Sequence, residues 1–249
     1  MKILVCLGNV PDTTTKVKFI NDNTDLDKTG IQWIINPWDE LALTRAMEIK
    51  EDSSNPVNKI TVITVGESDS EPTIRKALAI GADDAIRINT KPKDAYYVAG
   101  QMAEVIRKED FDIILCGIES ADYNGTAVGG MLSEFLGFSS VSAVSSLKLD
   151  GEKIILGREI DGGDQKIKTN TPLIAIVQKG IAIDPRIPAM RGIMMARKKP
   201  LNVVEPTDIA NLTEDIKYEL PQPKPPCQMI DPDNVKELID KLQNEAKVL

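Results

Sequence analysis

The residues best suited to chemistry lie in one polar loop, Gly117 to Gly130, which is rich in Gly, Ser, Asp, Asn and Thr. The apolar run before it, Asp112 to Cys116, is typical of a buried parallel strand. The stretch after it, Ala127 to Gly137, has the pattern of a helix that ends at a glycine. Asn124 or Thr126 would cap this helix, so that its free N–H groups face a bound phosphate. A plain turn between a strand and a helix accounts for the loop equally well. Its spacing matches neither Gly-x-Gly-x-x-Gly nor Gly-x-x-x-x-Gly-Lys-Ser/Thr.

The elements that must position this loop alternate between strand and helix over residues 1 to 137. Strands are predicted at 2–7, 31–35, 60–65, 85–88 and 112–116, and helices begin near Pro37, Pro72, Asp94 and Ala127. This alternation predicts an α/β fold with a doubly wound, mostly parallel (Rossmann-like) sheet. The loops that follow the strands, among them 8–12 and Gly66, would meet at the ligand-binding edge of that sheet. Asp39 is expected to cap the helix that begins near Pro37.

The later part of the chain departs from this alternation. Residues 140–149 and 153–159 flank an Asp-Gly-Glu turn and predict a hairpin, and a further turn at 161–164 leads to a strand at 171–177. We expect this portion to be antiparallel and to add to the sheet or cover it.

Two segments beyond the sheet suggest contacts with other proteins. Residues 184–197 form a proline-bracketed loop rich in Met, Ile and cations, which is either a docking loop or a helix that packs Ile193, Met194 and Ala196 on the core. Residues 221–226 form a proline-rich linker, and Asp231–Asn234 begins a last helix with Val235, Leu238, Ile239 and Leu242 on one stripe. We therefore predict an α/β domain over 1–200 and an extended C-terminal partner-binding arm over 201–249.

The composition excludes several classes of function. The chain has 249 residues, 42% of them hydrophobic, and a net charge of −8, which argues against nucleic-acid binding. It contains no histidine, so Ser-His and Cys-His catalysis are excluded. Its three cysteines, Cys6, Cys116 and Cys227, have neither metal-binding nor disulfide spacing. The N-terminal apolar run is too short for a signal or a membrane span, and we expect a reduced, cytoplasmic setting.

The whole chain resembles the beta subunit of the electron transfer flavoproteins. Four stretches carry the resemblance in order: Ile3–Cys6 with Val10–Asp12, Ile35–Glu40, Arg158–Gly163 followed by Pro172, and Asp184–Arg186 through Ile193–Lys199. The Asp-Gly-Gly element at 161–163 and the Ile-Met-x-Ala-Arg-Lys element at 193–198 are specific in combination.

The resemblance implies an electron carrier rather than an enzyme. Such a protein pairs with an alpha subunit as a heterodimer and receives electrons from flavin dehydrogenases such as acyl-CoA dehydrogenase. The redox FAD is shared with the alpha subunit and lies mainly on it. The beta subunit buries a structural AMP, or a second FAD in bifurcating members, which oxidise NADH. The run 10–14 is similar to anaerobic bacterial members, which favours FAD without deciding the matter.

The resemblance also assigns residues to two sites. The nucleotide pocket falls on Cys6, Asn36, Pro37, Asp39, Val65, Gly66, Gly117, Asp122, Asn124, Gly125 and Thr126. Partner docking falls on Met190, Arg191, Ile193, Met194, Lys198 and Lys199, with Met190 as the apolar anchor in place of the family's leucine. An aspartate beside a phosphate is unexpected, so Asp122 either holds a ribose hydroxyl or braces the loop.

Two other functions are compatible with an adenine-binding doubly wound fold. An ATP-cleaving enzyme would need a Ser-Gly-Gly phosphate loop after the first strand, and Gly8-Asn9-Val10-Pro11 is not such a loop. A stand-alone nucleotide-binding stress protein would leave residues 184–249 unexplained.

Overall fold

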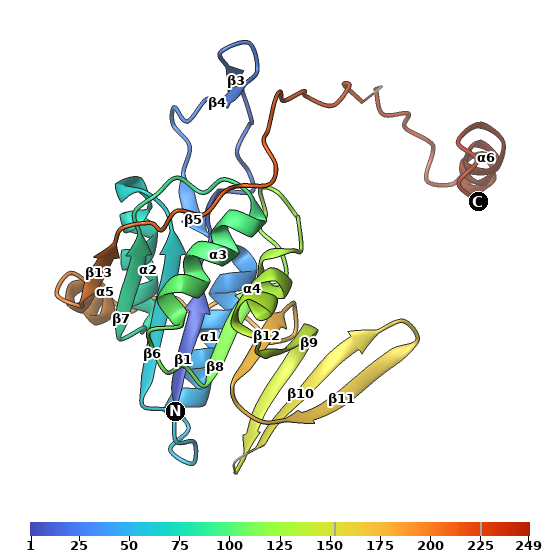
Figure 1. The fold of residues 1–249 in the computed structure, drawn as a ribbon. Helices are drawn as coiled ribbons and strands as arrows, with labels where there is room; N and C mark the ends of the chain where they lie inside the picture. The colour runs from blue at the N-terminus through green and yellow to red at the C-terminus, as the bar shows by residue number, and fades with distance from the viewer. Residues whose placement is uncertain (152, 225) are drawn as a thin grey trace.

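The fold is a central sheet with helices on both faces and a long C-terminal arm, as Figure 1 shows. The computed structural model describes residues 1–151, 153–224 and 226–249. The predicted turn at 150–152 and the proline linker at 221–226 therefore each include one residue outside the described part. The strands of the sheet are β1 (Lys2–Cys6), β6 (Lys59–Val65), β7 (Asp84–Ile88), β8 (Ile113–Gly117), β9 (Ser139–Asp150), β10 (Lys153–Ile160), β11 (Gly163–Thr169), β12 (Leu173–Val177) and β13 (Leu201–Val204).

Within the described residues these nine strands form one sheet in the order β11-β10-β9-β12-β8-β1-β6-β7-β13. From β9 to β13 each neighbouring pair is parallel, with Ile3 of β1 opposite Ile60 of β6 and Ile113 of β8. The predicted α/β, mostly parallel sheet is therefore confirmed. Since the chain winds from β1 to β6 and β7 on one side and then crosses to β8 on the other, the switch point lies between β1 and β8. Ligands of open α/β sheets bind at such a point.

The prediction that residues 140–177 are antiparallel is only partly right. β10 runs antiparallel to both β9 and β11, but β12 runs parallel to β9 and to β8. The reason is that β9 has two partners along its twelve residues: 139–144 pair with β12, and 144–150 pair with β10. Ala143, with φ of 56°, lies where the β12 pairing shifts register. Turn chemistry alone does not reveal this division of one strand.

Two helical layers bury the sheet. One face packs against α1 (Pro37–Glu51) and α2 (Glu71–Ile80), and the other packs against α3 (Ala95–Ile106) and α4 (Val128–Leu136), which lie nearer the viewer in Figure 1. Alternate residues of a strand serve the two layers, as Val5 faces the first core and Leu4 the second. The helix α3 begins where the sequence predicts, and the side chain of Asp94 caps it by accepting from the N–H of Tyr97 at 2.7 Å.

Short strands extend the loop after β1 beyond the sheet. β2 (Asn9–Pro11) pairs with β5 (Trp33–Ile35), and β3 (Phe19–Ile20) pairs with β4 (Asp25–Leu26), both antiparallel. In Figure 1 the β3–β4 hairpin projects from the top of the molecule. α1 begins directly after β5, so this excursion delivers the N-terminus of α1 to the sheet edge.

The C-terminal arm begins as part of the sheet and only then extends away from it. β13 adds residues 201–204 to the edge of the sheet beside β7, so the body continues past the predicted boundary at residue 200. The chain then crosses the top of the molecule, passes the β3–β4 hairpin and ends in α6 (Val235–Asp240) and a π-helical turn over Lys241–Glu245, far from the sheet in Figure 1. None of the helices in the described residues has both the length and the apolar character needed to cross a membrane.

Candidate functional site

One buried carboxylate joins the two loops at the switch point. Asp39, in the first turn of α1, accepts hydrogen bonds from the N–H of Gly8 after β1 and of Gly117 at the end of β8, both at 2.8 Å. Its two oxygens are thus occupied by backbone groups from adjacent strands, and it does not cap α1 as the sequence predicts. A side chain at Gly117 would bring its Cβ within 2.3 Å of Asp39 Oδ1, so glycine is required there. Asp39 therefore holds the loops together.

Asn36 completes this brace. Its Nδ2 donates to Asp39 Oδ2 at 3.1 Å and to the carbonyl oxygen of Glu119 at 2.8 Å, and its Oδ1 accepts from the N–H of Ala121 at 3.1 Å. Pro37 then begins α1, where a missing N–H costs nothing. The side chains of Asn36 and Asp39 thus bind the backbone at the start of the polar loop and fix its position.

Burial gives Asp39 an unusual acidity. Desolvation raises the pKa of Asp39 to about 6, against the lowering effect of the hydrogen bonds from Gly8, Asn36 and Gly117. Asp122 raises it slightly further through charge repulsion. Near neutral pH the carboxylate is ionised at a cost to folding, which is compatible with its role as an acceptor of N–H groups.

The end of the polar loop presents unpaired donors. Asn124 and Thr126 have φ of 50°, and for a β-branched threonine such a left-handed conformation is rare and is typical of functional loops. Among the described residues, the N–H groups of Gly125, Thr126 and Ala127 donate to no protein acceptor. A Cβ placed on Gly125 would meet nothing within 4 Å. These donors lead directly into the positive N-terminus of α4.

The predicted capping of α4 is wrong. The cap position belongs to Ala127, and neither Asn124 nor Thr126 makes a side-chain cap hydrogen bond. The physical reason is that the left-handed backbone at 124 and 126 turns those two residues away from the extended conformation that a capping residue needs. The first N–H groups of the helix are therefore left for another partner.

The remaining predicted pocket residues border the same edge. Cys6 is buried at the end of β1, and Val65 and Gly66 end β6, the strand next to β1. Gly66 packs against Ser70, whose Oγ would lie 2.7 Å from an added Cβ. Asp122 lies exposed in the loop and accepts from the N–H of Tyr123 at 2.9 Å, which is a bracing contact.

The residues fit the phosphate end of an adenine nucleotide. The fit rests on the unpaired N–H groups at 125–127, the space beside Gly125 and the N-terminus of α4, which together suit an anion. The loop carries no Lys or Arg, so backbone dipoles would supply the positive potential. Asn124, Gly125 and Thr126 would hold the phosphate, while Cys6, Val65 and Gly66 would line the adenosine side.

Sequence reasoning missed three residues that shape these surfaces. Arg87 is buried beside the edge, where its Nη1 donates to the carbonyl oxygen of Gly66 at 3.0 Å and to Asn89 Oδ1 at 2.8 Å. An arginine inside the buried strand 84–88 was the available signal. The other two residues are Arg75 and Tyr123. Their hydrogen-bond partners lie far away in the sequence, and no local pattern predicts these contacts.

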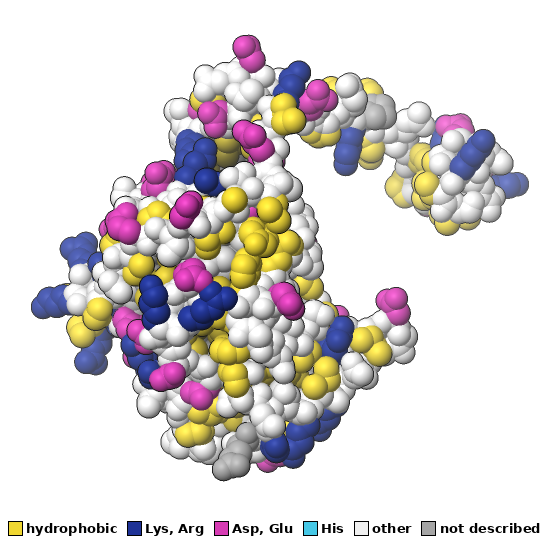
Figure 2. All heavy atoms as spheres, viewed as in Figure 1, with side chains coloured by type: hydrophobic (Ala, Val, Ile, Leu, Met, Phe, Trp, Pro, Cys, Tyr) yellow, Lys and Arg dark blue, Asp and Glu magenta, His cyan; other side chains and the backbone are white. Residues whose placement is uncertain are grey.

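The predicted docking loop contains a short helix, α5 (Met190–Ala196), with exposed apolar side chains. Met190 is 74% and Met194 69% exposed, and Ile193 is also exposed, whereas Ala196 is buried. The packed-helix alternative is therefore right only for Ala196. Figure 2 shows Lys and Arg side chains around hydrophobic ones at the end of the molecule where α5 lies.

A reciprocal clamp fixes α5 on α2. Arg75 of α2 donates to the carbonyl oxygens of Ala196 at 2.9 Å and Lys199 at 2.8 Å, and Lys199 Nζ donates to those of Leu78 at 2.9 Å and Ala82 at 2.6 Å. Each cation thus satisfies carbonyl groups at the end of the other helix. Burial lowers the pKa of Lys199. Its ammonium serves the clamp inside this chain, whereas Lys198 is exposed.

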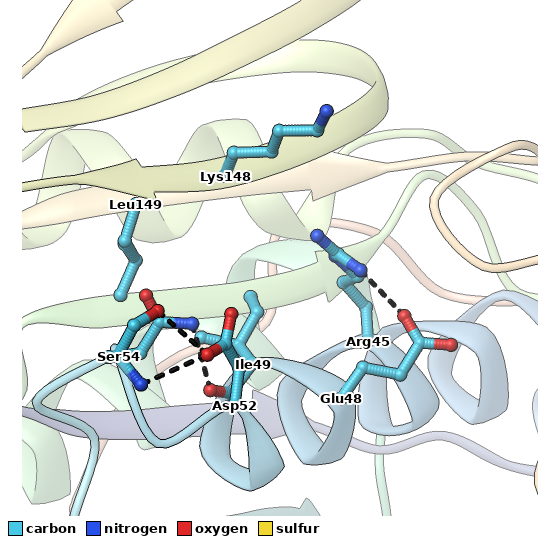
Figure 3. A pocket seen from close by; sticks show the side chains of 8 residues that line it. Arg45, Glu48, Ile49, Asp52, Ser54, Lys148 and Leu149 are labelled. Atoms are coloured by element: carbon cyan, nitrogen blue, oxygen red, sulfur yellow. Dashed lines mark hydrogen bonds and ion pairs between the residues drawn. The ribbon is translucent and has the colours of Figure 1, made fainter.

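A further hollow in the described structure lies apart from these surfaces. It has a volume of about 240 Å³, and Figure 3 shows it between α1 and β9. The guanidinium group of Arg45 donates hydrogen bonds to the carbonyl oxygen of Leu147 and forms an ion pair with Glu48. The carboxylate of Asp52 accepts hydrogen bonds from Ser54. These polar groups are already paired within the chain and are not free to bind a ligand. Nor do the described residues group three or more His, Cys, Asp or Glu side chains in a way that would hold a metal.

Fold and site together define a doubly wound α/β protein with an anion-suited loop at its switch point and an exposed apolar helix apart from it. The electron transfer flavoprotein domain matches residues 24–209 of the chain. The chain therefore belongs to the electron transfer flavoprotein family.

Its relatives are beta subunits of this family. The electron transfer flavoprotein subunit beta of Bacillus subtilis is 32% identical over 263 residues, which cover 100% of both chains. That of Syntrophomonas wolfei is 33% identical over 226 residues, covering 90% of this chain and 87% of the relative. That of Homo sapiens is 28% identical over 256 residues, covering 100% and 99%. The resemblance identified from the sequence is thereby confirmed.

Proposed function

We propose that this chain is the beta subunit of a heterodimeric electron transfer flavoprotein that carries electrons from flavin dehydrogenases, or from NADH, to an acceptor. The observation that carries the proposal is the exposed apolar face of α5, clamped to the body by Arg75 and Lys199. A nucleotide-binding protein that works alone has no use for such a surface. The chain itself carries electrons without catalysing a reaction of its own.

The nucleotide site is proposed to hold AMP or a second FAD. Asn124, Gly125 and Thr126 would bind the phosphate through backbone N–H groups, and Asn36 and Asp39 would keep the loop at the switch point. A bound flavin supplies one- and two-electron chemistry, and AMP would be structural. The residues of this chain bind the group and shield it from water, and they need no histidine for that.

The docking surface is proposed to receive flavin dehydrogenases such as acyl-CoA dehydrogenase. Met190 and Met194 are flexible apolar side chains that adapt to a pocket on the partner. Arg191 and Lys198 flank them and would steer an acidic partner towards the surface. Ile193 would complete the apolar contact.

The alpha subunit is proposed to grip the C-terminal arm. Val235, Leu238 and Ile239 recur at helical spacing on α6 and are all exposed, and no residue of α6 is buried. A helix of this length is not stable alone in water, so it needs a surface to pack on. The shared FAD would lie mainly on the alpha subunit, and a reduced, cytoplasmic setting is part of the proposal.

The experiment is electron transfer with the heterodimer of this chain and its alpha subunit, using acyl-CoA dehydrogenase as the donor. We expect Met190→Ala to slow flavin reduction by the donor about tenfold, as for the loss of an apolar anchor, without change in bound nucleotide. Val203→Ala, on the exposed side of the edge strand β13, is the control. An unchanged rate in Met190→Ala would show that the docking assignment is wrong.

A further inference from the structure

Three segments that are distant in the sequence meet at one carboxylate on the arm. The hydroxyl groups of Tyr123 and Tyr218 both donate to Asp215 Oδ2, at 2.9 Å and 2.8 Å, and lie 3.5 Å from each other. The ring of Tyr218 stacks on Phe19 of β3, with centroids 5.0 Å apart and planes at 10°. We call Phe19, Tyr123, Asp215 and Tyr218 the arm latch.

The arm is already fixed when it reaches this point. Asp94 Oδ2 accepts from the N–H groups of Leu212 at 2.6 Å and Thr213 at 2.8 Å, while its Oδ1 caps α3. The N–H of Tyr218 donates to the carbonyl oxygen of Asn23 at 2.8 Å, which ties the far side of the latch to the β3–β4 hairpin. Asp215 is therefore held between two anchors, and it presents a fixed acceptor to Tyr123.

Tyr123 connects this anchor to the polar loop. It lies one residue before Asn124 and three before Thr126, whose left-handed backbones shape the unpaired N–H groups. The side chain of Tyr123 is 62% exposed, and it takes no part in the phosphate contacts proposed above. Partial burial and then the hydrogen bonds with Tyr218 and Asp215 raise the pKa of Tyr123, so its phenol keeps the donated proton.

We propose that Asp215 and Tyr218 are positioning residues for the nucleotide loop, acting through Tyr123, so that nucleotide binding and anchoring of the arm are coupled. The inference rests on the proposed nucleotide site and adds a partner for it within the chain. Coupling of two sites is reciprocal: if the latch favours the binding conformation of the loop, bound nucleotide favours the latched arm by the same factor. The arm that leads to α6 is thus better ordered when the nucleotide is present.

The test measures AMP and FAD affinity of the full chain by calorimetry, and amide hydrogen exchange over 120–127 and 212–220. The variants are Tyr123→Phe, Asp215→Asn and the double variant. Tyr96→Phe is the matched control, because its ring packs on Phe135 and its hydroxyl bonds to no group among the described residues.

We expect each single variant to weaken AMP or FAD binding about fivefold, the lower end of usual coupling between sites. The double variant should bind no more weakly than Tyr123→Phe alone, because Tyr123→Phe removes the hydrogen bond that Asp215→Asn weakens. Nucleotide should slow exchange over 212–220 in the wild type and not in Tyr123→Phe. Tyr96→Phe should behave as the wild type.

Two results would overturn the inference. Unchanged nucleotide affinity in Asp215→Asn, with faster exchange of the arm, would make the latch an anchor of the arm alone. If the wild type binds neither AMP nor FAD, the proposed nucleotide site is wrong. The effect of the arm latch on the polar loop is then tested by hydrogen exchange in the ligand-free chain. Unchanged exchange over 120–127 in Asp215→Asn would then overturn the latch as well.

Discussion

At the scale of single residues, Asn36 and Asp39 hold together the two loops at the switch point of the sheet. Asn36 and Asp39 were predicted to line a nucleotide pocket, and both lie at the predicted edge. The structure shows that their polar atoms are used on Gly8, Gly117, Glu119 and Ala121. Local spacing predicts a helix cap at Asp39, but its carboxylate oxygens accept hydrogen bonds from backbone N–H groups 31 and 78 residues away. Such long-range competition leaves no trace in a local pattern.

Asp39 makes the stability of the chain depend on pH. The pKa of Asp39 is about 6 in the folded chain against an ordinary value of 3.8, so between about pH 4 and 6 the folded chain binds more protons than the unfolded chain. The unfolding free energy contributed by Asp39 therefore falls as pH rises through this window, by about 3 kcal/mol in total. In Asp39→Asn this contribution is absent.

Urea unfolding at several pH values checks this. We expect the stability of the wild type relative to Asp39→Asn to be greatest near pH 4 and to decline towards pH 7. Asp27→Asn is the control, because the hydrogen bonds from Thr29 lower the pKa of Asp27 and its contribution has the opposite sign. A constant difference between wild type and Asp39→Asn from pH 4 to 7 would contradict the account.

At the scale of elements, the periodic segments were predictable and their neighbours were not. Strands such as 60–65 and helices such as the one after Asp94 appear where apolar period and capping residues place them. The division of β9 between two partners and the seating of α5 on α2 depend on contacts across the fold. Gly192 shows the latter: an added Cβ would lie 2.4 Å from the carbonyl oxygen of Ala79, so α5 approaches α2 closely.

Arg75 is expected to control the order of α5. Replacing Arg75 with Ala removes two charge-assisted hydrogen bonds to the end of α5 and should lower the local free energy of opening by about 2 kcal/mol. Trypsin should then cleave after Arg191 and Arg197 roughly thirtyfold faster, because cleavage follows the population of the opened state. Lys76→Ala, the next residue of α2, removes an ion pair with Glu40 and is the control. Equal cleavage rates in the Arg75 and Lys76 variants would argue against the clamp.

At the scale of the whole molecule, the sheet and its helices bury a core of their own. The helix α6 at the end of the arm buries none of its residues. The large, mostly parallel sheet follows the α/β architecture expected from the sequence. The path of residues 205–218 along the body was not foreseeable, because it depends on single contacts with Asp94, Gln101 and Tyr123. The apolar stripe of α6 lies exposed at the end of the arm.

Removal of residues 227–249 should therefore weaken the heterodimer and leave the body folded. This deletion removes the exposed apolar side chains of α6, Val235, Leu238 and Ile239, and we expect at least a tenfold loss of affinity for the alpha subunit. The control replaces Lys236, Glu237 and Asp240 of α6 with Ala, which keeps the apolar stripe. Sizing chromatography and calorimetry measure the association. Unaltered association after the deletion would show that α6 does not contact the alpha subunit.

The central claim is that this chain holds an adenine nucleotide at the switch point of its sheet. The most direct measurement is the nucleotide released when the purified heterodimer is denatured, identified by mass and quantified by absorbance. The account predicts one adenine nucleotide per beta chain in addition to the shared FAD. One AMP would indicate a carrier with a single flavin, and two FAD would indicate a chain that accepts hydride from NADH. A heterodimer that releases only one FAD and no other nucleotide would contradict the claim.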